Sequence, residues 1–310
     1  MKFAFVFLTV CFAFVVKTNF RGWNNANNAF EKFKRRFSKT YRDPGEAVKR
    51  RRQYERCSNL INMHNSDYAV GRTTFSLKEN KFCDLYEEER RKFTTGSRET
   101  TSAFPDYRIL REWQVNDTAS VPESFDWQEM NCVTPVKDQG IHCSSAWAFS
   151  AIAAVESHWC IKTGKLMTLS EQQLVDCNRN NHTGNWACNG GNTAAAFMYI
   201  SATGGVQSDS TYGYQENVEH KEKFPCRFSN TKVKATTKGY LQLANINETM
   251  LRSVITSKGP VVALMSGSLE TFQLYSTGVF DDPSCQSDES FHSVLIIGYG
   301  SYNGVVSVLT

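Results

Sequence analysis

A chain of 310 residues can hold one large domain or two smaller ones, and its net charge of +4 is divided unevenly along its length. Residues 1–120 carry 23 Lys and Arg against 14 Asp and Glu, whereas residues 121–310 carry 12 against 17. The basic run 49–52 could indicate nucleic-acid binding or nuclear import, but such a run is usually a solvated helix face. Because the second part of the chain has the opposite charge, it is the simpler partner, and we expect no nucleic-acid partner.

The N-terminus has the features of a secretory signal. Residues 3–16 are apolar behind Lys2, a stretch too short to span a bilayer but suited to the core of a signal peptide. We expect a signal peptide over 1–18, with removal near 17–22. No other apolar run is long enough to cross a membrane, so no membrane span is expected. This route leads to secretion or to lysosomes and endosomes. Three sequons could be glycosylated along it, at Asn116, Asn181 and Asn247.

A regular helical stripe begins at Glu46. It continues in steps of three and four residues, which places six side chains on one face of a helix: Glu46, Arg50, Tyr54, Cys57, Ile61 and Asn65. An ordinary amphipathic helix would give such a stripe, but the charge pair and the Asn on it indicate a specified packing surface. The stripe resembles the E-x3-R-x3-F-x2-N-x3-I-x3-N helix of papain-family propeptides, with Tyr54 in place of Phe and Cys57 in place of Asn.

A second propeptide-like segment follows the helix. Asn80, Phe82 and Asp84 resemble the N-x-F-x-D segment of the same propeptides, with Lys78 where the family often has Gly. The resemblance implies an inhibitory propeptide domain over 26–95, folded as a small helical unit. Little periodicity is present over 96–120, which is typical of a linker. In the family, this linker passes in an extended form through the active-site cleft and keeps the zymogen inactive.

The segment 143–150 reads Cys-Ser-Ser-Ala-Trp-Ala-Phe-Ser, follows a Gln-Gly pair and opens a predicted helix over 147–163. Further segments follow in a fixed order: 169–177, 188–191, 259–262, 272–275, 291–293 and 297–300. Together these segments resemble the catalytic domain of the papain family of cysteine peptidases, of the cathepsin L-like kind. The resemblance covers the chain from about residue 26 to its last residue.

The resemblance implies an α+β fold of two lobes, with a helical left lobe and a right lobe built on a β-barrel-like sheet. The catalytic domain would occupy 121–310, and strands of the right lobe are expected over 261–264, 278–280 and 294–297. The sequence stops at Thr310, just before the family's Asn-Ser-Trp-Gly segment. We therefore expect a truncated right lobe with an unpaired strand edge and uncovered apolar faces.

Thiol proteolysis needs a cysteine thiolate whose pKa is lowered by a helix N-terminus and an imidazolium, together with oxyanion donors and a group that orients the histidine. By resemblance, Ala146 occupies the nucleophile position, His292 matches the family's histidine, and Gln139 matches the side-chain oxyanion donor. The resemblance implies substrate contacts at Trp147, Gly190, Gly191, Asn192 and Thr193. The polarity of the last two argues against a simple preference for large apolar side chains. We expect no cofactor and no metal.

Three departures from the family pattern argue against catalysis. A methyl group at Ala146 cannot attack a carbonyl. The loop containing Ile141 and His142 is one residue longer than in the family, which changes the aim of Gln139. No residue matches the family's orienting Asn, because Asn303 lies in the turn that precedes that position. We therefore expect a zymogen-form homologue that is catalytically inactive.

The expected partners are protein or peptide substrates or protease inhibitors in the cleft, together with the chain's own propeptide. Two alternatives stay open from the sequence. One is an active cathepsin L-like cysteine endopeptidase in its intact form, and the other is a non-functional product of a decayed gene.

Ten cysteines in a chain with a secretory signal predict disulfides. Cys11 would leave with the signal peptide, so nine remain. By family position, two bridges are implied, Cys143–Cys188 and Cys177–Cys226. The family partner of Cys285 lies beyond Thr310, which predicts a free thiol there. The remaining four are extra to the family pattern and either form two more bridges or stay free: Cys57, Cys83, Cys132 and Cys160.

Overall fold

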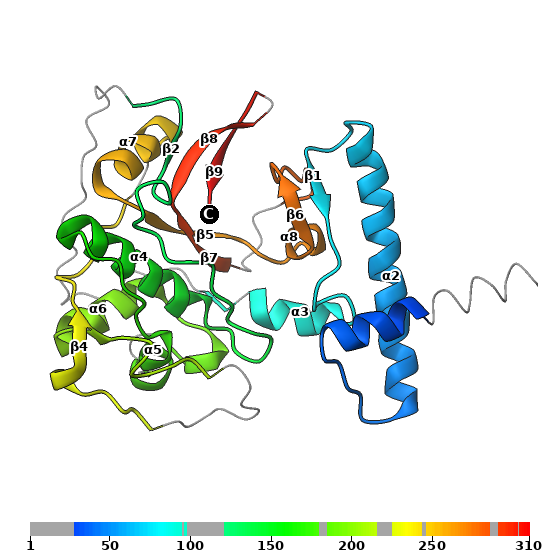
Figure 1. The fold of residues 1–310 in the computed structure, drawn as a ribbon, viewed down its shortest axis with the longest axis horizontal. Helices are drawn as coiled ribbons and strands as arrows, with labels where there is room; N and C mark the ends of the chain where they lie inside the picture. Colours follow the sequence, from blue (N-terminus) through cyan, green and yellow to red (C-terminus); the bar gives the residue numbers. More distant parts are fainter. Residues whose placement is uncertain are drawn as a thin grey trace, which may run out of the picture. The chain divides into compact units, whose positions relative to one another are not determined.

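The computed structural model describes residues 28–94, 96–97, 121–179, 185–215, 225–243, 246–285, 291–302 and 304–310. The expected signal peptide, the linker beyond residue 97, Asn303 and the sequons at Asn116 and Asn181 lie outside these ranges. The chain divides into two compact units. Unit 1 comprises Met1–Glu87 with Gln273–Asp281, and unit 2 comprises Glu88–Phe272 with Asp282–Thr310 (Figure 1).

Unit 1 is built on the long helix α2, Pro44–Ala69. Asp43 begins this helix because its side chain accepts a hydrogen bond from the backbone N–H of Glu46, and Pro44 has the backbone angle that a first helical turn requires. A shorter helix covers residues 28–36. Strand β1 (Phe75–Leu77) pairs antiparallel with β6 (Tyr275–Gly278), which brings two distant parts of the sequence into one unit.

The predicted stripe on α2 faces the core of unit 1. Tyr54 and Cys57 are buried with Phe30, Phe33, Phe75, Leu77, Cys83 and Leu274, and Ile61 packs against this cluster. Asn65 pairs with the backbone of Leu77, since its side chain donates to the carbonyl oxygen at 2.9 Å and accepts from the N–H at 2.8 Å. The helix is thereby fixed both to the apolar cluster and to the edge of β1.

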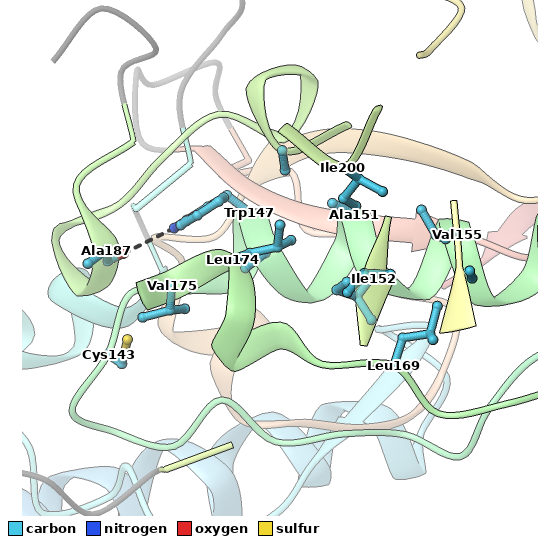
Figure 2. Close-up of a cluster of buried hydrophobic side chains, with 14 residues drawn as sticks. Cys143, Trp147, Ala151, Ile152, Val155, Leu169, Leu174, Val175, Ala187 and Ile200 are labelled. Carbon is cyan, nitrogen blue, oxygen red and sulfur yellow. Dashed lines mark hydrogen bonds between the residues drawn. The ribbon is translucent and has the colours of Figure 1, made fainter. Parts of the chain in front are cut away.

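The longest helix in the described part of unit 2 is α4, which has 18 residues over Ala146–Thr163. The other helical elements in the described part of the unit are α3 (Glu87–Thr94), α5 (Glu171–Cys177), α6 (Thr193–Thr203), α7 (Glu248–Lys258), α8 (Glu270–Gln273) and the short 3₁₀ helices Ala187–Asn189 and Asn230–Lys232. Eleven residues of α4 are buried, because α4 is enclosed by α5, α6 and strand β7. Figure 2 shows the apolar cluster around it, with Trp147 at one end and Val155 at the other.

The strands of unit 2 form three small sheets. Strand β5 (Val261–Ser266) pairs antiparallel with β7 (Phe291–Ile296), and Met265 lies opposite His292. Strand β8 (Gly298–Tyr302) lies between β2 (Phe125–Asp126) and β9 (Val305–Leu309). A third pair joins β3 (Val206–Gln207) to β4 (Val233–Ala235).

One expected strand is wrong. The sequence predicts a strand of the right lobe over 278–280, whereas β6 ends at Gly278 and pairs with β1 in unit 1. The apolar pair that follows Gly278 made the segment resemble a strand start, but Phe280 instead packs against the aromatic cluster of unit 1, with its ring centroid 4.7 Å from that of Phe75. On β9, Val306, Val308 and Leu309 are exposed.

None of the helices in the described residues is long and apolar enough to cross a membrane.

Candidate active site

The candidate site begins at the N-terminus of α4. Ala146 is the first residue of this helix and is 4% exposed, so a small methyl group stands where the helix dipole is most positive. Trp147, which follows it, is fully buried, and its indole N–H donates to the carbonyl oxygen of Ala187 at 3.2 Å (Figure 2). The disulfide Cys143–Cys188 ties the chain before α4 to the same 3₁₀ helix. These contacts fix the helix start firmly against the core.

The loop from Gln139 to Ser145 is anchored by Tyr214, a residue to which the sequence assigned no role. The Tyr214 hydroxyl donates to the carbonyl oxygen of Gln139 at 2.9 Å and lies 2.8 Å from the Ser145 hydroxyl. Its ring meets Phe149 of α4 edge to face, with 4.8 Å between centroids. Gly140 adopts a φ of +79°, a left-handed conformation that suits glycine. The side chain of Gln139 donates to the carbonyl oxygen of Phe93 at 2.8 Å.

His292 lies on β7, which packs against α4. Its side chain is half-buried, and its Nδ1 atom is enclosed with no hydrogen-bond partner among the described residues. Burial lowers the pKa of His292 to about 4, because a charged ring would lose its hydration with no anion to compensate. The imidazole of this structure is therefore neutral at pH 7.

A segment from the N-terminal part of the chain, a helix followed by two non-helical residues, is bound in this site. We call residues 88–94 and 96–97 the strap; its first part belongs to α3 and its last two residues are extended. The N–H of Gly191 donates to the carbonyl oxygen of Gly96 at 2.8 Å, and the N–H of Ser97 donates to the carbonyl oxygen of Phe291 at 3.1 Å. Ser97 thus forms a parallel β-bridge with Gly191 and an antiparallel β-bridge with Phe291.

Close packing explains why glycines occupy this region, at the strap contact for Gly96 and Gly190 and against Trp147 for Gly191. A Cβ atom on Gly96 would lie 2.5 Å from Cβ of Ser144, and one on Gly190 would collide with the carbonyl oxygen of Gly96. A Cβ atom on Gly191 would lie 2.6 Å from the ring of Trp147. The Ser144 hydroxyl also donates to the carbonyl oxygen of Lys92. The site is therefore shaped to receive the backbone of an extended chain.

The two polar residues after Gly191 have different environments. Asn192 is buried and begins α6, because its side chain accepts a hydrogen bond from the N–H of Ala195 at 3.1 Å. The Thr193 hydroxyl instead lies 3.3 Å from the Ser293 hydroxyl. The structure thus uses Asn192 to cap a helix and leaves Thr193 within reach of the residue after His292.

A buried ion cluster supports the helices beneath the site. The ammonium of Lys137 lies 2.6 Å from a carboxylate oxygen of Glu156 on α4 and 2.5 Å from one of Glu171 on α5. Burial raises the pKa of Glu171 to about 7, although the Lys137 ammonium acts in the opposite direction. No local sequence pattern marks this cluster, since its members are 34 positions apart at the widest. No group of three or more His, Cys, Asp or Glu side chains within the described ranges is placed to hold a metal ion.

The propeptide-like residues of unit 1 form a second connected set. The Asp84 carboxylate accepts hydrogen bonds from Lys39 at 2.7 Å and from the Tyr41 hydroxyl at 2.9 Å. Arg50 lies 3.4 Å from Glu46 and donates to the carbonyl oxygen of Asp84. Tyr54 donates to Glu79 at 2.9 Å, and burial raises its pKa above the ordinary value.

The second segment of the motif is held as firmly. Asn80 accepts from the N–H of Phe82 and donates to the carbonyl oxygen of Gln273. Phe82 is half-buried, and its carbonyl oxygen accepts from the N–H of Leu85. Every residue of the predicted motif is therefore part of the packing or hydrogen bonding of unit 1.

Comparison with known proteins identifies the family of this chain. Residues 121–309 match the family described as papain family cysteine protease, and residues 30–89 match the cathepsin propeptide inhibitor domain (I29). The chain belongs to the papain family of cysteine proteases. It is 37% identical to a cathepsin L-like peptidase of Aedes aegypti over 273 residues, which are 87% of this chain and 78% of that protein. Procathepsin L of Rattus norvegicus is 36% identical over 258 residues, covering 83% and 73% of the two chains.

Solved structures of the papain family give the same result. The digestive procathepsin L 3 of the Tenebrio molitor larval midgut superposes with a TM-score of 0.79 and 32% identity, covering 91% of this chain and 87% of that one. The expected fold class, an α+β papain-like fold with a propeptide domain, is confirmed. The chain thus has the form of a cysteine peptidase zymogen with its own inhibitory propeptide.

Proposed function

We propose that this papain-family chain binds extended peptide segments in its cleft without hydrolysing them. The carrying observation is Ala146 at the start of α4, the position that the family's nucleophile would occupy. Covalent catalysis requires a side chain that can form an acyl-enzyme, and a methyl group has no electron pair to donate. The neighbouring Ser145 does not replace it, because its hydroxyl is engaged with that of Tyr214.

The state of His292 supports the same proposal. In a thiol protease, a thiolate and an imidazolium stabilise each other, so each shifts the pKa of the other toward the charged form. Ala146 supplies no such anion, and burial lowers the pKa of His292 to about 4. A neutral His292 can still accept a hydrogen bond, but it has no thiol proton to remove.

The strap supports the binding half of the proposal. Backbone hydrogen bonds hold Gly96 and Ser97 between Gly191 and β7, and Gln139 and Ser144 contact the strap from the other side. All of these bonds are made to main-chain groups of the strap, at Gly96 and Ser97 and at the helical carbonyl oxygens of Phe93 and Lys92. Protein or peptide substrates and protease inhibitors are therefore the proposed partners, and the chain's own propeptide is the resident one.

We assign the domains on the same basis. Residues 26–95 would form the inhibitory propeptide, 96–120 the linker and 121–310 the catalytic domain, after a signal peptide over 1–18. The proposed location is outside the cell or in lysosomes and endosomes, which suits the four disulfides of the described residues. Relatives named as digestive cysteine proteinases in Homarus americanus support a secretory route.

Two measurements test the proposal. After removal of the propeptide by an added protease that is then inactivated, a papain-type fluorogenic peptide should remain uncut. A labelled peptide with the sequence of residues 90–98 should nevertheless bind and be displaced by its unlabelled copy. Turnover that a thiol-directed epoxide inhibitor blocks would overturn the first part, and the absence of any saturable binding would overturn the second.

A further inference from the structure

The side chain of Ser97 is received by a set of hydroxyl groups. Ser97 is 3% exposed, and the hydroxyl of Ser293, itself 5% exposed, donates to its oxygen at 2.7 Å. The Thr193 hydroxyl lies 3.3 Å from that of Ser293, and the Ser150 hydroxyl lies 3.4 Å from that of Thr193. The four hydroxyls come from the strap, β7, α6 and α4, so the contact is made by the fold as a whole.

The main chain determines where this side chain must lie. The N–H of Ser97 donates to Phe291, and the carbonyl oxygen of Gly96 accepts from Gly191, so the strap is held on both sides of the Ser97 α-carbon. The strap approaches so closely that a Cβ atom on Gly96 would collide with Ser144 and one on Gly190 would collide with Gly96, so the path has little freedom. Any peptide that follows the same path presents one side chain to Ser293.

The lining of this position favours a small polar group. Ser293 and Ser150 are buried, and a buried hydroxyl that loses its hydrogen-bond partner is destabilising. A leucine or phenylalanine in place of Ser97 would remove the partner of Ser293 and would also need volume that the closed surroundings do not offer. Serine or threonine fits the available volume and continues the hydrogen-bonded chain.

We propose that Ser293, Thr193 and Ser150 form a hydroxyl-lined subsite that selects a serine or threonine side chain from the bound peptide, with Ser97 as its resident ligand. This inference rests on the proposed function and names the class of segment that the cleft prefers. Ser150 donates its single hydroxyl proton to the carbonyl oxygen of Trp147 at 3.4 Å, so its oxygen is the acceptor in the contact with Thr193.

The test uses the full-length chain, in which the strap is a tethered ligand. Hydrogen exchange of the Gly191 and Ser97 amides measures strap release, because both amides are bonded across the strap contact. We expect Ser97→Thr to retain protection, Ser97→Ala to speed exchange about five- to tenfold, and Ser97→Leu to speed it further. Exposed Ser210→Ala is the matched control, and protection of α5 amides verifies that each variant is folded.

A second set of variants tests whether the preference for serine at position 97 depends on the hydroxyls of Ser293 and Thr193. With Ser293→Ala and Thr193→Val, a serine at 97 has lost its partners, so Ser97→Ala should now slow exchange instead of speeding it. The inference is overturned if Ser97→Leu protects Gly191 as well as serine does, or if the Ser97→Ala and Ser293→Ala effects add independently. Because the ligand is tethered, these outcomes are separate from the free-peptide binding and turnover that test the proposed function.

Discussion

The charge state of His292 has consequences at the scale of a single residue. Its enclosed Nδ1 and its pKa of about 4 mean that the folded chain resists protonation there, whereas an unfolded histidine titrates near its ordinary value of 6.5. The unfolded state therefore binds more protons between these two values. Above about pH 7 the titration of this residue does not lower the free energy of unfolding, and as the pH falls from 7 toward 4 it lowers that free energy progressively.

His292→Gln should reduce the acid sensitivity of the fold, because glutamine has no charge to acquire. We expect the variant to lose less free energy of unfolding than the parent between pH 7.5 and pH 4, by on the order of 2 kcal/mol. Urea unfolding at the two pH values measures this difference. Replacement of the exposed His142 by Gln controls for the loss of one imidazole. An equal loss in parent and His292→Gln would contradict the assigned pKa.

Restoring a thiol at the start of α4 should not restore ordinary activity. The sequence predicts that Gln139 is the oxyanion donor and that its loop is one residue longer than in the family, and a misplaced oxyanion donor typically costs about a hundredfold or more in kcat. We expect Ala146→Cys with His142 deleted to exceed Ala146→Cys alone by about tenfold or more with a fluorogenic peptide after propeptide removal. Family-like turnover by the single variant would show that the longer loop is harmless.

The residues of the site differ in whether the sequence alone could indicate their roles. Gln139, Ala146 and His292 stand in motifs whose order along the chain carries information without any structure. Tyr214 and Ser293 have no such signal, because their roles depend on which hydroxyls the fold brings within 3.3 Å of one another. Polar contacts of this kind are non-local, and one sequence alone does not reveal them.

At the scale of elements, α2 shows what periodicity can predict and what it cannot. Steps of three and four residues predicted its buried face, and that face packs in the core of unit 1. The partner of β6 could not be predicted, since its pairing with β1 joins residues that are some 200 positions apart. Strand-like sequence was visible near Gly278, but only the tertiary structure decided where the strand ended.

Asn65 is the polar residue that sets the register between α2 and β1. Asn65→Ala would leave the N–H and carbonyl oxygen of Leu77 without their side-chain partner, and we expect a loss of about 2 kcal/mol in the stability of the full-length chain. Chemical denaturation measures it. Asn62→Ala, on the exposed face of the same helix, should change stability by less than about 0.5 kcal/mol. Equal effects of the two substitutions would mean that Asn65 contributes nothing specific.

The cluster of Lys137, Glu156 and Glu171 joins α4 to α5 and should behave as a unit. Lys137→Met would leave two buried carboxylates without their cation, a change that typically costs about 3–5 kcal/mol. Adding Glu171→Gln should recover part of that loss, because one buried charge is then removed. Thermal unfolding of the single and double variants measures both effects. A double variant that is less stable than Lys137→Met would contradict this account.

At the scale of the whole molecule, each disulfide of the described residues joins two segments of the same unit. Cys57–Cys83 closes unit 1, while Cys132–Cys160, Cys143–Cys188 and Cys177–Cys226 lie in unit 2. Counting cysteines predicted that bridges form, and family position implied two of them, but spacing alone left the other four residues open. Proximity in the fold decides the pairing, since bridged α-carbons lie only 4.3 to 5.4 Å apart.

Cys285 is the free thiol of the described residues and is exposed, with its N–H bonded to the carbonyl oxygen of Asp282. Because the eight bridged cysteines have no thiol, alkylation of the non-reduced protein should label Cys285 ahead of them, as peptide mass mapping would show. An exposed thiol in an oxidising compartment pairs readily with another chain, so a dimer that reductant dissolves should accompany the monomer. Cys285→Ser should abolish both the label and that dimer. Labelling of Cys143 or Cys188 before Cys285 would mean that the bridge at the start of α4 is not formed, and the site would not be ordered as described. Labelling of Cys177 or Cys226 would mean the same of the bridge at the end of α5.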